Sequence, residues 1–137
     1  MSRRIIITQE DMRKLKKLVD DEIDDVKNKP HVIELDTELK CAEIVDKDDL
    51  PYDVISMNST VFMLLDDIEE TVTLVYPQEA DLSANNISIL SPIGTAIIGY
   101  REGDVFEWTV PSGTTKIAIK KVLYQPEADE RAAASAD

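Results

Sequence analysis

Five acidic residues fall within six consecutive positions and form the densest group of side chains in this sequence that could do chemistry. They are Asp20, Asp21, Glu22, Asp24 and Asp25. If the segment is helical, residues four apart share one face. Carboxylate oxygens suit hard cations such as Mg²⁺, but two of them leave an octahedral shell incomplete, so a metal would need ligands from a partner. A solvated acidic face is the alternative, and we predict no resident metal.

Basic residues precede this cluster, at Arg13, Lys14, Lys16 and Lys17. This order is the reverse of the one that the helix dipole favours, which is acids at the start of a helix and bases at its end. A local rule broken in this way can mark a functional segment. It is also compatible with a solvated face that Lys27 and Lys29 partly neutralise.

Nucleophilic and cofactor chemistry find little support in the sequence. The single Cys41 excludes an intramolecular disulfide and a cysteine-based zinc site, and the single His31 removes most histidine chemistry. We interpret Cys41 as a packing residue and His31 as an exposed turn residue. Neither a G-x-S-x-G elbow nor a phosphate-binding loop is present. We therefore predict no catalytic residues, no cofactor and no enzymatic activity.

The charge balance limits the partners. The formal net charge is −13, from 28 acids and 15 bases. Such a chain repels a phosphate backbone, so we expect no strong direct binding to nucleic acid. A basic protein surface is a better partner, although the charge can also serve solubility alone. No apolar run approaches the roughly 20 residues that span a membrane, and we expect a cytoplasmic protein.

Apolar periodicity predicts two helices over about residues 9–46. The first stripe is Met12, Leu15, Val19, Ile23 and Val26, and the second is Val32, Leu35, Leu39 and Ala42. The Thr8 hydroxyl can cap the first helix. Asn28 to Pro30 separates the stripes, so we expect a short antiparallel hairpin. A first helix of about 18 residues would be about 27 Å long.

From Pro51 the pattern changes to that of strands, which makes the fold class α+β. We predict strands at 54–57, 60–65, 71–76, 87–90, 105–110 and 115–124, mostly antiparallel, with one short helix after Pro92. The predicted organisation is a hairpin over residues 1–50, a sheet domain over 51–126, and a frayed, disordered tail over 127–137.

One ordered string of motifs resembles a known family. Residues 87–99 read ISILSPIGTAIIG, followed by Arg101-Glu102-Gly103-Asp104, Trp108 and Pro111-Ser112-Gly113. This order is similar to the C-terminal domain of the bacterial Gre transcription elongation factors. The segments around Leu50–Ser59, Leu74–Pro77 and Tyr124–Ala128 also resemble the Rnk-type members, described as regulators of nucleoside diphosphate kinase.

The resemblance implies an FKBP-like sheet domain that docks at the rim of the RNA polymerase secondary channel. Leu90, Ser91, Pro92 and Ile93 match the family's docking loop; core packing is the alternative role of Leu90 and Ile93. Gre factors carry acids at the tip of a long coiled coil to the polymerase Mg²⁺. This hairpin is shorter and its turn, residues 28–31, lacks an acid.

The favoured interpretation is therefore a non-enzymatic, monomeric transcription regulator that binds bacterial RNA polymerase and competes with Gre factors. Two alternatives stay open: an active transcript-cleavage factor, and a prolyl isomerase suggested by the FKBP-like fold alone. The chain's few, scattered aromatic residues do not favour the second.

Overall fold

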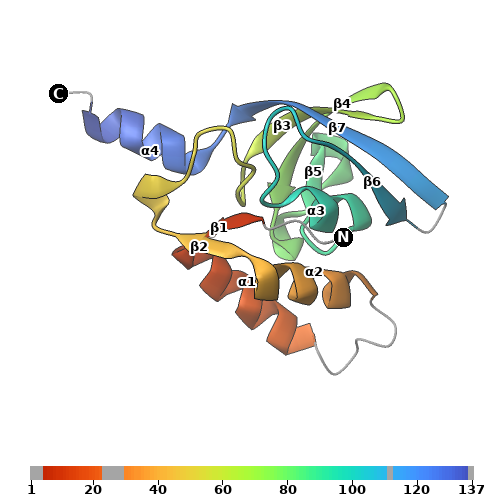
Figure 1. The fold of residues 1–137 in the computed structure, drawn as a ribbon, viewed down its shortest axis with the longest axis horizontal. Helices are drawn as coiled ribbons and strands as arrows, with labels where there is room; N and C mark the ends of the chain where they lie inside the picture. The colour runs from red at the N-terminus through yellow and green to blue at the C-terminus, as the bar shows by residue number, and fades with distance from the viewer. Residues whose placement is uncertain (1–4, 23–29, 111–112, 136–137) are drawn as a thin grey trace.

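The computed structural model describes residues 5–22, 30–110 and 113–135, and its architecture is α+β, as predicted (Figure 1). Three short 3₁₀ turns, η2 (Lys47–Asp49), η3 (Pro77–Glu79) and η4 (Leu82–Ala84), lie in the connections. The helices and strands, in chain order, are β1 (Ile6–Thr8), α1 (Gln9–Glu22), α2 (Pro30–Cys41), β2 (Glu43–Val45), β3 (Thr60–Leu65), β4 (Ile68–Val75), β5 (Asn86–Ser88), α3 (Pro92–Ile97), β6 (Val105–Val110), β7 (Gly113–Tyr124) and α4 (Pro126–Ser135).

The main sheet has the strand order β5-β4-β3-β7-β6. The β3–β4, β3–β7 and β6–β7 pairs are antiparallel, and the edge strand β5 pairs parallel to β4. Strands β3 and β6 have the predicted bounds, because alternating burial is readable from the sequence. The β3–β7 register shifts twice, between Thr60 and Val61 and between Phe62 and Met63. Such irregularities bend and twist strands, and this sheet curls.

The N-terminal segment combines two helices with a small sheet. Strands β1 and β2 pair in parallel and bring the start of α1 beside the end of α2. The predicted cap of α1 is confirmed, since the Asp11 backbone N–H donates to Thr8 Oγ1 at 3.1 Å. Helices α1 and α2 contact each other, while the turn predicted between them lies outside the described residues.

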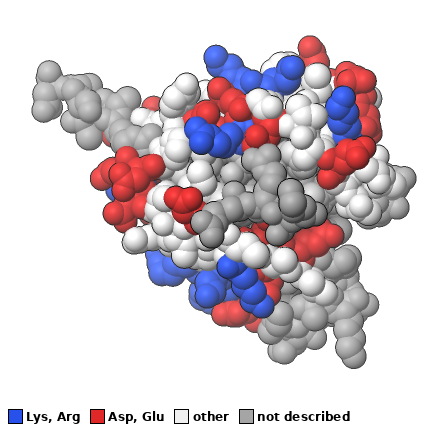
Figure 2. Space-filling view, in the orientation of Figure 1, with Lys and Arg blue, Asp and Glu red and all other residues white. Residues whose placement is uncertain are grey.

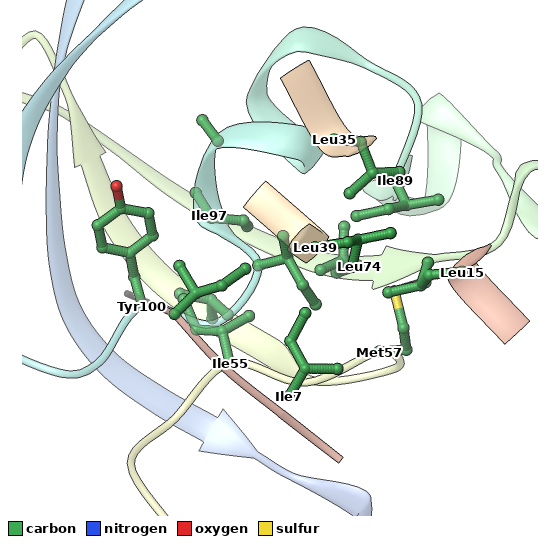
Figure 3. Close-up of a cluster of buried hydrophobic side chains, with 14 of the residues drawn as sticks. Ile7, Leu15, Leu35, Leu39, Ile55, Met57, Leu74, Ile89, Ile97 and Tyr100 are labelled. Atoms are coloured by element: carbon green, nitrogen blue, oxygen red, sulfur yellow. The ribbon is translucent and has the colours of Figure 1, made fainter. Parts of the chain in front are cut away.

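One hydrophobic core joins the N-terminal helices to the main sheet. Leu15 of α1 and Leu35 and Leu39 of α2 lie in the same buried cluster as Leu74 and Ile97 (Figure 3). Leu15 and Leu35 have no exposed surface. Helix α2 also contacts α3. The apolar stripes therefore bury against the sheet as well as against each other.

Several local expectations differ from the structure. Residues 54–57 are not a strand: Val54 makes an isolated bridge to Arg101, and Ile55 exchanges backbone hydrogen bonds with Tyr100 and Gly99. The second helix ends at Cys41, because Glu43–Val45 pairs with β1 instead. These pairings involve residues far apart in sequence, which helical and strand periodicity does not report.

The residues that were expected to form a frayed tail make a helix instead. Pro126 opens α4, which continues to Ser135. A proline is well suited to the first turn of a helix, and Glu127 and Asp129 in that turn complement the helix dipole. Gln125, almost fully buried, fixes the entry: its Nε2 donates to the carbonyls of Pro51 and Val54 at 2.8 and 2.6 Å. Residues 126–135 are thus helical.

The surface reflects the acidic composition. Figure 2 shows Asp and Glu side chains spread over much of the visible face, with Lys and Arg side chains between them. No helix in the described part of the chain is both long and apolar enough to cross a membrane.

Candidate docking site

The segment between β5 and α3 is held in one conformation by its own side chains. Ser91 Oγ donates to the Ser88 carbonyl at 2.6 Å and accepts from the Gly94 N–H at 3.1 Å, which caps α3. Ser88 Oγ in turn accepts from the Leu90 N–H at 3.0 Å. Pro92 fixes the first position of the helix. The loop therefore presents its side chains without further ordering.

Helix α3 anchors this loop to the core. The buried Thr95 hydroxyl donates to the Ile89 carbonyl at 2.6 Å. Ala96 and Ile97 are fully buried, so the helix cannot slide without disturbing the core. Gly94 is required here, because a Cβ at this position would overlap the Ser88 carbonyl. The loop and the core are therefore one rigid unit.

An open groove of about 520 Å³ runs beside the loop. Its apolar side chains come from the loop, from β5, and from the β3–β4 hairpin, where Ile68 is 63% exposed. The groove is lined by Leu65, Asp66, Ile68, Glu70, Ile87, Ser91, Pro92, Ile93 and Thr115. Asp66 and Glu70 add negative charge to this mostly apolar groove, which suits a partner with both apolar and basic side chains.

The structure brings three of the four predicted docking residues to this groove. Ser91, Pro92 and Ile93 line it and are half-buried. Leu90 is also half-buried and packs against the core, as Ile93 does on its inner side. Sequence reasoning missed Ile68 and Leu65, because only the pairing of β4 with both β3 and β5 places that hairpin beside the loop.

The acidic cluster is only partly within the described residues. Asp20 and Asp21 are exposed on α1, and Asp21 forms an ion pair with Lys17 at 3.1 Å. Glu22 ends α1, while Asp24 and Asp25 lie outside the described residues. A second i,i+4 pair joins Lys14 to Glu10 at 3.2 Å. Such exposed pairs contribute about 0.3–0.5 kcal/mol each, which partly offsets the unfavourable charge order.

Cys41 and His31, the two residues considered for nucleophilic or base chemistry, lie near opposite ends of α2. Cys41 is exposed at the end of α2, not packed as expected, because the chain turns there into β2. His31 belongs to the first turn of α2 instead of the connecting turn. Within the described ranges, no three acidic, histidine or cysteine side chains are grouped to hold a metal.

A buried polar cluster lies away from the groove and was not expected from the sequence. Asp11, which is 9% exposed, accepts from the Met57 N–H through Oδ2 at 3.2 Å. The adjacent Ser56 hydroxyl donates to Glu127 Oε1 at 2.6 Å and lies 2.9 Å from Ser59 Oγ. Burial raises the pKa of Asp11 to about 6, with a smaller contribution from the negative charge of Glu127. Nothing in the local sequence around Asp11 signals this burial.

Comparison with known proteins assigns both halves of the chain. Residues 50–124 match the family described as transcription elongation factor GreA/GreB, C-terminal, and residues 3–45 match the Rnk N-terminus. The regulator of nucleoside diphosphate kinase from Escherichia coli strain K12 is 40% identical over 97 residues, which cover 69% of this chain and 71% of the relative.

Two elongation factors are also similar. Transcription elongation factor GreA from Clostridium botulinum strain Langeland is 38% identical over 108 residues, covering 74% of this chain and 68% of the relative. The solved structure of the prokaryotic transcription elongation factor GreA/GreB from Nitrosomonas europaea has a TM-score of 0.74 and 36% identity, covering 88% of this chain and all of that one. The relatives are named as regulators or elongation factors, not as catalysts. This chain therefore belongs to the GreA/GreB family of transcription elongation factors, with an Rnk-type N-terminal segment.

Proposed function

We propose that this protein is a non-enzymatic transcription regulator that binds bacterial RNA polymerase at the rim of its secondary channel. The proposal rests on one observation: residues 91–93, which lie within the segment that matches the family, line a defined groove on the surface. Ser91, Pro92 and Ile93 are held rigidly at the edge of a mostly apolar groove that also contains acidic residues. A preordered apolar loop loses little conformational entropy when it binds, which favours docking.

The two N-terminal helices, α1 and α2, form a short arm. Its length favours a protein that occupies the secondary channel without causing transcript cleavage. Helix α1 has 14 residues, or about 21 Å at about 1.5 Å per residue. Its apolar face, with Leu15 and Val19, is buried in the core that it shares with the sheet. An arm packed along its own domain extends less far than a free coiled coil, so Asp20 and Asp21 would stop short of a distant active site. Competition with Gre factors for the same dock follows.

The decisive experiment is a pull-down of purified bacterial RNA polymerase with the tagged full chain at low and moderate salt. We expect retention of the polymerase, and we expect that added GreA displaces this protein. An absence of binding at low salt would contradict the proposal. In a parallel pull-down with purified nucleoside diphosphate kinase, retention of the kinase when polymerase is not retained would favour the activity in the name of the E. coli relative.

A cleavage assay separates regulator from cleavage factor. A backtracked polymerase complex with a labelled transcript should not be shortened faster when the protein is added. Rapid shortening that is lost in Asp20→Asn, Asp21→Asn variants would show instead that the acidic cluster reaches the catalytic metal.

A further inference from the structure

The two ends of the described chain meet at two neighbouring residues. Asp11 near the start of α1 binds the Met57 N–H at 3.2 Å, and Glu127 in the first turn of α4 binds the Ser56 hydroxyl at 2.6 Å. Ser56 is also tied to Ser59, whose Oγ accepts from the Ser56 N–H at 3.0 Å. Residues 56–59, called the platform below, thus bind a carboxylate from each end of the described chain.

The negative charges of Asp11 and Glu127 repel each other. Burial raises the pKa of Asp11 most, and the charges of Glu127 and Glu10 raise it further, while the Met57 N–H and Lys14 lower it. On the β4 side, the hydroxyl of Tyr76 is buried and has no hydrogen-bond partner within the described residues. Burial and the charges of Asp11, Glu10, Glu127 and Glu79 raise the pKa of Tyr76. The groups around the platform are thus mostly acidic, with Lys14 as a counter-charge that also pairs with Glu10.

The hydrogen bonds that attach helix α4 to the rest of the protein come from residues at its start. Gln125, 3% exposed, anchors the entry through two hydrogen bonds to backbone carbonyls. Beyond that anchor, Glu127 holds the first turn to Ser56, and Glu130 makes an exposed contact with Lys47 at 3.8 Å. The Ser56–Glu127 bond is the half-buried link of this helix to the platform, and a negative charge on nearby Asp11 acts directly against it.

We propose that α4 is a strap that closes on Ser56 when Asp11 is protonated and loosens when Asp11 is ionised. A proton on Asp11 removes the repulsion of Glu127 and leaves Oδ2 able to accept from Met57. Loosening of α4 would widen the groove of about 260 Å³ that Ala128 and Asp129 form with Tyr52, Val122 and Leu123. This device does not depend on the docking loop, which lies at another place in the fold.

The test is amide hydrogen exchange of α4 in the full chain at about pH 5 and about pH 7.5, corrected for intrinsic exchange rates. Amides of β3 and β7 in the same molecule report global opening. We expect α4 protection to fall on going to the higher pH while β3 and β7 change less. If the charges of Asp11 and Glu127 shift each other's pKa by one unit, the protection of the α4 amides should change by about tenfold between the two pH values.

Variants separate the strap from a general effect of pH. Asp11→Asn cannot ionise and keeps an acceptor for Met57, so α4 should stay protected at both pH values. Glu127→Gln keeps an acceptor for Ser56 and should reduce the pH dependence as well. Asp129→Asn is the matched control, because Asp129 is exposed on the same helix and its removal should leave the dependence intact.

Two results would overturn the strap. One is equal α4 protection at both pH values in the wild type, and the other is full pH dependence in Asp11→Asn. Should that variant fold poorly, an NMR titration of the Asp11 carboxyl in the wild type and in Glu127→Gln decides the question. The carboxyl must titrate at lower pH in Glu127→Gln, and an unchanged midpoint would show that the two groups do not interact.

Discussion

Gly94 of α3 lies so close to the carbonyl oxygen of Ser88 that no side chain fits between them. The same carbonyl accepts from the Ser91 hydroxyl, and Ser91 caps the helix that Gly94 helps to begin. The shape of the docking loop thus depends on one missing Cβ, which ties β5 to α3 across the proposed binding edge.

Gly94→Ala should reshape the loop, because the new methyl group must displace backbone instead of a flexible side chain. We expect a loss of about 1–3 kcal/mol in the free energy of unfolding, measured by chemical denaturation. Polymerase binding should weaken more than this loss of stability explains, since the folded fraction stays high. Gly103→Ala is a useful comparison: a Cβ there meets no neighbour, although its φ of 91° still carries strain. Normal binding by Gly94→Ala would argue against a role for this loop geometry.

Ile93→Asp should weaken polymerase binding while the protein stays folded. Ile93 lines the apolar groove, and a buried charge without a partner opposes association. We expect at least about a tenfold rise in Kd, or about 1.4 kcal/mol, by fluorescence anisotropy or interferometry. Leu82→Asp is the control, because Leu82 is 83% exposed and does not line this groove. Equal losses in both variants would point to general charge repulsion instead.

Leu35→Ala tests whether the arm and the sheet fold as one unit. Leu35 has no exposed surface and belongs to the shared core, so truncation should cost about 2–5 kcal/mol. Both the arm and the sheet should then unfold in a single, earlier transition, followed by near-ultraviolet and far-ultraviolet circular dichroism. Ile33→Ala on the same helix is the control, since Ile33 is 49% exposed and should cost little. Separate transitions for arm and sheet would contradict a common core.

Asp11→Asn should stabilise the protein at neutral pH. Burial raises the pKa of Asp11 from its ordinary value of 3.8 to about 6, so the folded state holds the proton more tightly than the unfolded state. The contribution of the protonated form is complete below about pH 3.8 and is lost as the pH rises through about 6. The variant should therefore exceed the wild type at pH 7 by at most about 3 kcal/mol, and the difference should vanish near pH 4.

Thermal melts of the two proteins between pH 4 and pH 8 measure this difference directly, because the other carboxylates are common to both. Asp20→Asn is the matched control on the same helix: Asp20 is exposed, and its removal should change the melting temperature little at any pH. A wild type as stable as Asp11→Asn throughout would show that Asp11 is not destabilised by burial.

The sequence by itself determined the elements whose signal is local. Alternation predicted β3 and β6, and the apolar stripes predicted the buried residues of α1 and α2. The capping role of Thr8 also follows from neighbouring residues. The ordered string around Ser91 was enough to indicate the family, because turn and cap residues are fixed by backbone geometry.

Only the tertiary structure decided what those elements pack against. Glu43–Val45 became a strand because β1 lies beside it, and the segment after Tyr124 became a helix entered through buried Gln125. The groove needed Ile68 of β4 and Ile93 of α3 to line one surface, and the buried polar cluster needed Asp11 and Glu127 to bind the neighbouring residues Met57 and Ser56. Contacts between distant residues depend on how the whole core closes, which no local periodicity records.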